Sequence, residues 1–135
     1  MLKLSKKAEY ALMAARYMAL KNSNAFSTAK EISESYSISF QLVAKVLQNL
    51  VKNELAISVK GMNGGFTLAK KPENISLIDI ISAVESNYKI VDCLKPNASL
   101  TDCLHFDCCK IKDPLAEIQR KIDTIFVETS LVEIL

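Results

Sequence analysis

Residues 39–69, SFQLVAKVLQNLVKNELAISVKGMNGGFTLA, decide the fold because the hydrophobic period changes within this stretch. Residues 39–53 carry apolar side chains at helical spacing, which predicts an amphipathic helix that begins after Ser39. The next residues alternate like two short strands, Ala56–Lys60 and Phe66–Ala69, on either side of a loop that holds all three glycines of the chain. The sequence therefore predicts a helix that leads directly into a two-stranded hairpin. The predicted buried stripe of the helix is Leu42, Val43, Val46, Leu47, Leu50 and Val51.

Four further helices are predicted around this unit. Apolar spacing predicts the first over residues 5–20, and Thr28 begins a short one that ends at 35–37. Another runs from 76 to about 85. Asp113-Pro114 begins a long last helix, to about residue 128, before a short apolar turn. The fold class is mainly α with a small two-stranded β wing.

The face of the 39–53 helix opposite its apolar stripe is polar and carries no acid. Such a face can enter a DNA major groove, about 12 Å wide, where Gln and Asn bond adenine edges and Lys favours guanine or phosphate. Glycines in the hairpin loop let the backbone approach a phosphate or a minor groove. Any surface helix has a polar face, so it is the order of helix, short helix, turn, longer helix and hairpin that indicates a winged helix-turn-helix. The predicted DNA contacts are Thr28, Ser39, Gln41, Lys45, Gln48, Asn49, Lys60, Gly61, Asn63 and Gly64.

Charge is distributed unevenly along the chain. Residues 1–70 contain ten basic and four acidic residues, a net charge of +6, whereas residues 71–135 contain seven basic and eleven acidic residues, a net charge of −4. A basic first half suits a polyanionic partner, although two ordinary charged faces would give the same balance. No apolar run approaches the roughly 18 residues of a membrane span, and no secretory signal is recognisable. We therefore expect a cytoplasmic protein with reduced thiols.

All four cysteines lie between residues 93 and 109, in a segment, 86–110, that has no helical period. This clustering favours metal ligands or redox thiols over a disulfide framework. Thiolates are soft ligands that suit iron–sulfur clusters or zinc, but the spacing is not the paired C-x-x-C typical of structural zinc sites. A thiol switch or a set of structural thiols would also use cysteines. His105, in the same segment, is either a ligand or an ordinary loop histidine.

The chain resembles the IscR/NsrR family of bacterial regulators over nearly its whole length, as far as Ser130-Leu131. The residues that carry the resemblance include Ser5-Lys6-x-x-Glu9-Tyr10-Ala11, Lys60-Gly61-x-x-Gly64-Gly65-Phe66 and Ile78-x-x-Ile81-x-Ala83-Val84-Glu85. The resemblance implies a homodimeric transcription factor with a winged domain (1–85), a cysteine-containing cofactor loop (86–110) and a dimerisation helix with a C-terminal turn (111–135). Ala44 stands where some relatives place a Glu, so the operator sequence is not transferred.

For the cofactor, the resemblance implies three cysteine ligands and one further ligand. It points to Cys93, Cys103 and Cys109, with Cys108 as a competitor for the third position. Lys112 occupies the position where some members have a histidine ligand. Other members use a first-helix carboxylate donated by the other subunit, and Glu9 stands there. The expected cofactor is an iron–sulfur cluster, first [2Fe–2S], with [4Fe–4S] or zinc as alternatives.

Together these features predict a DNA-binding repressor, not an enzyme, whose affinity for a palindromic operator is set by the cluster in response to redox state, nitric oxide or iron. One alternative is a zinc- or thiol-switched repressor. The other is a thiol or metal-delivery protein, against which stand the missing paired redox motif and phosphate-cradling loop.

Overall fold

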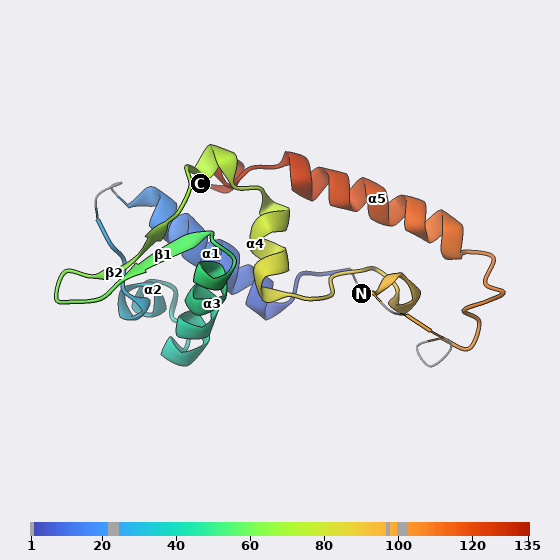
Figure 1. Cartoon of the computed structure of the whole chain (residues 1–135), viewed down its shortest axis with the longest axis horizontal. Coiled ribbons are helices and arrows are strands. Elements are labelled where there is room, and N and C mark those ends of the chain that lie inside the picture. Colours follow the sequence, from blue (N-terminus) through green and yellow to red (C-terminus); the bar gives the residue numbers. More distant parts are fainter. Residues whose placement is uncertain (1, 22–24, 97, 100–102) are drawn as a thin grey trace.

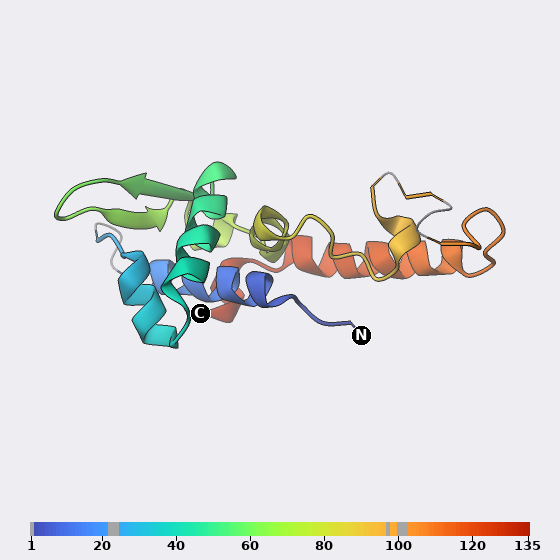
Figure 2. The same ribbon diagram turned by 90° about the horizontal axis from the view of Figure 1, so that it is seen from below.

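The computed structural model describes residues 2–21, 25–96, 98–99 and 103–135. The molecule is elongated, with a winged domain at one end, while the described part of the cysteine segment, residues 86–110, runs from α4 toward the other end, where α5 begins (Figures 1 and 2). The wing tip and the start of α5 lie at opposite ends of the long axis (Figure 1). The elements are α1 (Lys6–Leu20), α2 (Ala29–Tyr36), α3 (Phe40–Lys52), β1 (Ala56–Val59), β2 (Gly65–Leu68), η1 (Pro72–Asn74), α4 (Leu77–Val84), η2 (Asp92–Leu94), α5 (Lys112–Glu128) and η3 (Leu131–Ile134).

Local capping sets most helix starts where the sequence predicts them. The Thr28 hydroxyl oxygen accepts a 3.1 Å hydrogen bond from the backbone N–H of Glu31 at the start of α2, and Ser76 and Asp79 form a reciprocal capping box at α4. The predicted start of the last helix, with Asp113 as the N-cap and Pro114 as the first helical residue, is wrong by two residues, because Ile111 is the N-cap and α5 begins at Lys112. Pro114 lies within the first turn, where proline is tolerated because a first-turn N–H has no helical partner.

The core of the winged domain lies between α1, α3 and α4, with α2 packed against α3. From α3 it takes Val43, Val46, Leu47 and Leu50, as predicted. Leu42 contradicts the prediction, since it is 46% exposed. It lies at the outer edge of the stripe, where it lines a hollow between α3 and α1 that leaves part of its side chain open to solvent. Periodicity alone could not distinguish this edge from the centre of the stripe.

The wing is an antiparallel pair with Ala56 opposite Leu68 and Val59 opposite Gly65. A bridge joins it to the segment before α2, since the Ser27 N–H donates to Phe66 O at 2.8 Å and the Phe66 N–H donates to Ser27 O at 2.7 Å. Gly65 makes this approach possible, because a Cβ there would lie 2.7 Å from Ser27 O. The wing is therefore held by the pairing of its two strands and also by this bridge to the helix-turn-helix.

Helix α5 returns from the far end of the molecule to the winged domain (Figure 1). There the C-terminal turn packs into the core, and Leu131 is completely buried. Arg16 in α1 holds the same turn by donating from Nε to Ile134 O at 3.0 Å. These elements confirm the predicted fold class, a winged helix-turn-helix with a long C-terminal helix. Across the described chain, no helix has the length and apolar character needed to cross a membrane.

Candidate DNA interface and cysteine segment

The outward face of α3 has the composition that the sequence predicts. Gln41, Lys45 and Gln48 are exposed on it, and Asn49 is half-buried at its edge. Ser39 is exposed at the N-cap and makes no capping hydrogen bond, so its hydroxyl is not used by the helix. No acidic residue occurs in α3. This face can accept a negatively charged groove without a repulsive contact.

The basic surface continues from α3 onto α1, which the sequence analysis did not single out. Lys6 and Lys7 line a shallow hollow of about 100 Å³ that Lys45 and Asn49 line from the other side. Lys6 also contacts Glu9 at 2.8 Å, and this hydrogen bond and charge raise the pKa of Lys6. The sequence does show two adjacent lysines, Lys6 and Lys7, at the start of a helix. Only the packing of α1 against α3 shows that they belong to the same basic surface as Lys45.

The wing presents its predicted contacts at the tip. Lys60, Gly61 and Asn63 are exposed, and the Gly64 N–H donates to Gly61 O at 3.1 Å to close the turn. Gly64 is required there, because a Cβ would lie 2.1 Å from Val59 O. Thr28 lies beside the Ser27–Phe66 bridge at the base of the wing, with its hydroxyl oxygen engaged as the cap of α2. The structure therefore groups most of the predicted DNA contacts on the α3 face and the wing.

The four cysteines are free thiols in a segment of short turns. Cys93 lies in η2 and is half-buried, as are Cys103 and Cys109, whereas Cys108 is exposed. Backbone bonds from Phe106 N–H to Cys103 O and from Cys108 N–H to His105 O, both 3.1 Å, define the turns between them. The Lys112 ammonium lies 3.8 Å from the centre of the Phe106 ring.

The candidate ligands are not yet gathered into one site. Over the described residues, which include all four cysteines, no three His, Cys, Asp or Glu side chains are close enough to hold a metal ion. His105 is exposed. Glu9 lies in the first turn of α1, within the winged domain, and is paired with Lys6. The thiols of this segment are ligands of the kind that hold iron–sulfur clusters, so their donor chemistry fits such a group.

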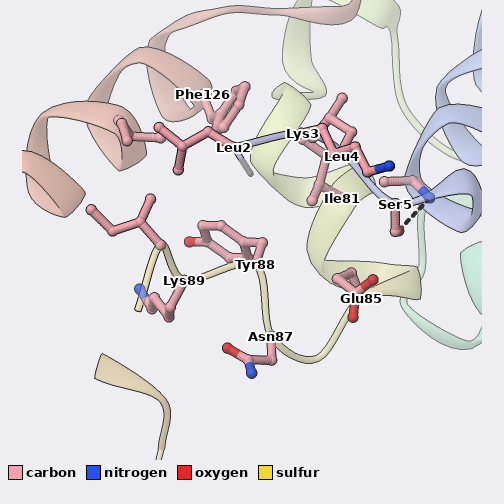
Figure 3. Close-up of a pocket in the computed structure, with 13 residues that line it drawn as sticks. Leu2, Lys3, Leu4, Ser5, Ile81, Glu85, Asn87, Tyr88, Lys89 and Phe126 are labelled. Carbon is pink, nitrogen blue, oxygen red and sulfur yellow. Dashed lines mark hydrogen bonds between the residues drawn. The ribbon is translucent and has the colours of Figure 1, made fainter. Parts of the chain in front are cut away.

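An open groove of about 650 Å³ lies between the N-terminal residues 2–5, α4, residues 87–90 and α5 (Figure 3). Its apolar lining comes from several elements, including Leu2, Ile81 and Phe126. Tyr88 and Lys89 project from the irregular segment that follows α4 (Figure 3). The groove therefore lies where the winged domain, the start of the cysteine segment and α5 meet.

Polar contacts hold residues 88–90 against α5. Lys89 Nζ pairs with Asp123 Oδ2 at 3.3 Å, and Gln119 contacts both Ile90 and Asp123. Burial first, and then the charge and hydrogen bond of Asp123, raise the pKa of Tyr88. Burial works to raise the pKa of Asp123, but hydrogen bonds from Gln119, Lys89 and Tyr88 outweigh it and hold that pKa below its usual value.

A winged helix-turn-helix with an acid-free recognition helix and a long C-terminal helix defines a DNA-binding transcriptional regulator. The Rrf2 family, described as an iron-dependent transcriptional regulator, matches residues 4–135, and the chain belongs to this family. The regulator NsrR of Shouchella clausii is 32% identical over 116 residues, which cover 86% of this chain and 76% of that protein. NsrR of Bacillus licheniformis is 33% identical over 114 residues, covering 84% and 78%.

Solved structures of other regulators are similar over almost the whole chain. The T. potens IscR structure has a TM-score of 0.74 and 26% identity, covering 98% of this chain and 85% of that one. The structure of CymR, the global cysteine regulator of B. subtilis, has a TM-score of 0.77 at 22% identity, covering 99% and 96%. The relatives confirm the predicted family resemblance and a regulator rather than an enzyme.

Proposed function

We propose that this regulator represses transcription as a cytoplasmic homodimer on a palindromic operator, and that an iron–sulfur cluster in the cysteine segment sets its DNA affinity. The exposed, acid-free face of α3, continuous with the lysines of α1 and flanked by the Lys60 wing, is the observation that carries the DNA-binding part. The cysteine segment and α5 carry the regulatory part.

We assign contacts with DNA base edges to the α3 face, and contacts with the DNA phosphate backbone to the residues around it. Gln41, Gln48 and Asn49 can bond base edges, whereas Lys45 and Lys60 neutralise phosphates. The other proposed residues contact the DNA phosphate backbone or let the protein approach it closely. They are Thr28, Ser39, Gly61, Asn63 and Gly64.

The proposed dimer interface is the apolar seam of α5. Ile111, Ile118 and Ile125 follow one another at seven-residue intervals and are all exposed, Ile125 to 62%. Leu115 and Ile122 complete a spacing of four and three residues, the pattern with which two helices pack along a shared seam. An exposed apolar seam of this kind, on a helix that extends from the winged domain, favours a second copy of this chain as the partner that packs against it. The seam continues through Ile122 into the groove beside residues 87–90.

The proposed cluster ligands are Cys93, Cys103 and Cys109, with Glu9 of the other subunit as the fourth. Cys108 and His105 are the alternatives. A [2Fe–2S] cluster is the first expectation, and [4Fe–4S] or zinc would use the same thiolates. When bound, the cluster would supply a group that oxidation, nitric oxide or iron shortage can remove. The Lys6–Glu9 pair has to open for Glu9 to serve, so cluster binding would also alter the basic surface beside α3.

Closing the cysteine segment is the proposed source of regulation. The cysteine segment connects α4 to the far end of α5, and α5 returns to the winged domain. A change in the path of this segment would therefore move α5 relative to α4, and with it the spacing of the two α3 helices in a dimer. Two-fold symmetry would place these helices on half-sites about one or two DNA turns apart.

The DNA-binding part is tested with a Lys45→Ala/Lys60→Ala double variant on promoter fragments. Each lost phosphate contact should lower the slope of log affinity against log salt by about 0.9, and affinity should fall about tenfold or more. A Lys70→Ala/Lys71→Ala variant removes the same charge at an exposed site between β2 and η1, away from the wing tip, and serves as the control. Wild-type affinity and slope in the Lys45/Lys60 variant would refute the proposed interface.

The cofactor part is tested by anaerobic purification, an absorbance spectrum and counts of iron and sulfide. Operator affinity is then compared with the cluster present, with it removed, and in Cys93→Ala. Comparing Cys109→Ala with Cys108→Ala identifies the third ligand, because loss of the ligand should abolish the chromophore and loss of its neighbour should not. Equal operator affinities in all three states would refute cluster control.

A zinc- or thiol-switched repressor is the second candidate. It is favoured by the exposure of Cys108 next to Cys109 and by the ungathered ligand residues of the described chain. An exposed thiol is open to oxidation. A colourless anaerobic protein whose operator affinity responds to a thiol oxidant or to zinc would support this candidate over the cluster.

A further inference from the structure

Gln119 is the only fully buried residue of α5, at 3% exposure, and one of two buried polar residues among those the structure describes. Its Oε1 accepts a 2.8 Å hydrogen bond from the backbone N–H of Ile90. Its Nε2 donates a 2.8 Å hydrogen bond to Asp123 Oδ1. The amide is therefore satisfied on both sides, between the chain that leaves α4 and the middle of the long helix.

Burying an amide is unfavourable unless it is hydrogen-bonded, and an apolar residue would fill the same space without that requirement. Ile90 lies in irregular backbone, so the Gln119 side chain meets a need that no helix or strand ladder meets. Ile90 is also only three residues before Cys93. The polar contact thus fixes the chain to α5 immediately before the first candidate ligand.

We propose that Gln119, oriented by Asp123, is a positioning residue that transmits the state of the cysteine segment to α5. This inference rests on the proposed regulation of DNA affinity by that segment. The Ile90–Gln119 bond would make residues 88–90 move with the long helix, so that a change at Cys93 is passed on to α5. Without it, only side-chain contacts of Tyr88 and Lys89 with Asp123 would remain here, and the Lys89–Asp123 pair, which is more than a quarter exposed, holds the backbone weakly.

The Gln119→Met variant tests this role, because Met keeps a similar length and volume but neither accepts from Ile90 nor donates to Asp123. The control is Thr124→Met, at an exposed position on the same helix. In the cluster-free protein, exchange of the Ile90 amide hydrogen should accelerate by about threefold to tenfold in Gln119→Met, the range expected for one lost hydrogen bond. The control should leave this exchange unchanged.

The second readout is the ratio of operator affinities with and without the cluster. Gln119→Met should bring this ratio toward one by a similar factor of about three to ten, while the affinity of the cluster-free protein stays within about twofold of wild type. A purely structural role would instead weaken both forms equally and leave the ratio unchanged. An unchanged ratio in a variant with accelerated Ile90 exchange would overturn the inference.

Two further outcomes are distinguishable. A wild-type ratio of one would overturn the proposed cluster regulation, and this inference with it, whereas a wild-type ratio above one that survives Gln119→Met would overturn the inference alone. If Gln119→Met does not fold, Asp123→Ala is measured instead, since it removes the acceptor that orients the Gln119 amide toward Ile90. Its ratio should move toward one, and an unchanged ratio would overturn the inference.

Discussion

The backbone N–H of Leu131, which follows α5, donates a 2.8 Å hydrogen bond to the backbone oxygen of Ile75, which precedes α4. A second bond, from Leu77 N–H to Thr129 O at 2.9 Å, completes a bridge between the two segments. The C-terminal end of α5 is thereby fixed to the start of α4. Its other end adjoins the cysteine segment, so a displacement there acts on a helix whose opposite end is anchored in the winged domain.

Leu131→Ala should destabilise the protein by about 2–5 kcal/mol, because it removes a completely buried side chain from the core and leaves a cavity. Urea unfolding followed by circular dichroism would measure the loss. Val132→Ala, at a position 46% exposed in the same turn, should cost less than about 1 kcal/mol. Equal effects of the two substitutions would mean that the C-terminal turn is not part of the core in solution.

The seam of α5 makes a prediction about oligomeric state. Ile118→Asp/Ile125→Asp should yield a monomer in sedimentation equilibrium, since two apolar contacts per subunit are replaced by charges that a helix–helix interface cannot hydrate. Thr124→Asp puts the same charge on an exposed position of the same helix and should leave the dimer intact. A dimeric double variant would place the interface on another surface.

Sequence reasoning succeeded where structure is set locally. The cap at Thr28, the capping box at Ser76 and the glycine-rich hairpin each depend on residues a few positions apart, which the sequence displays directly. It failed for Leu42, because the limit of a buried stripe depends on what packs against it. It also missed the burial of Gln119, whose partner Ile90 lies 29 residues away.

In the candidate site, too, the features set by neighbouring residues could be predicted, and those set by packing could not. The polar α3 face could be predicted because a helix places residues three or four positions apart on one side, whereas the addition of Lys6 and Lys7 depends on how α1 packs beside α3. The four cysteines were evident in the sequence as candidate ligands, but which of them meet depends on the path of a segment without a regular period. Their assignment therefore stays a prediction, together with that of the individual DNA contacts.

The wing turn predicts different effects for two neighbouring glycines. Gly64→Ala should lower operator affinity about tenfold with the dimer intact, because its Cβ would lie 2.1 Å from Val59 O and the turn that presents Lys60 would have to open. Gly61 has a φ of +119° but open space around it, so Gly61→Ala should strain the backbone and have the smaller effect. Electrophoretic mobility shifts on a promoter fragment would compare the two, and a larger effect of Gly61→Ala would contradict the turn geometry.

The environment of Asp123 predicts how stability depends on pH. Its pKa is held below the usual value in the folded protein, so the folded state binds fewer protons at this group than the unfolded chain does. The resulting stabilisation is fully present above the unfolded pKa, about 4, and is lost as pH falls through the lower folded pKa. The unfolding free energy of the cluster-free protein should therefore decrease more steeply below about pH 4 in wild type than in Asp123→Asn. Gln119→Met removes one of the hydrogen bonds that lower this pKa and should give an intermediate slope. Parallel pH profiles for all three proteins would show that Asp123 is not held by these contacts, and the attachment of residues 88–90 to α5 would then need another explanation.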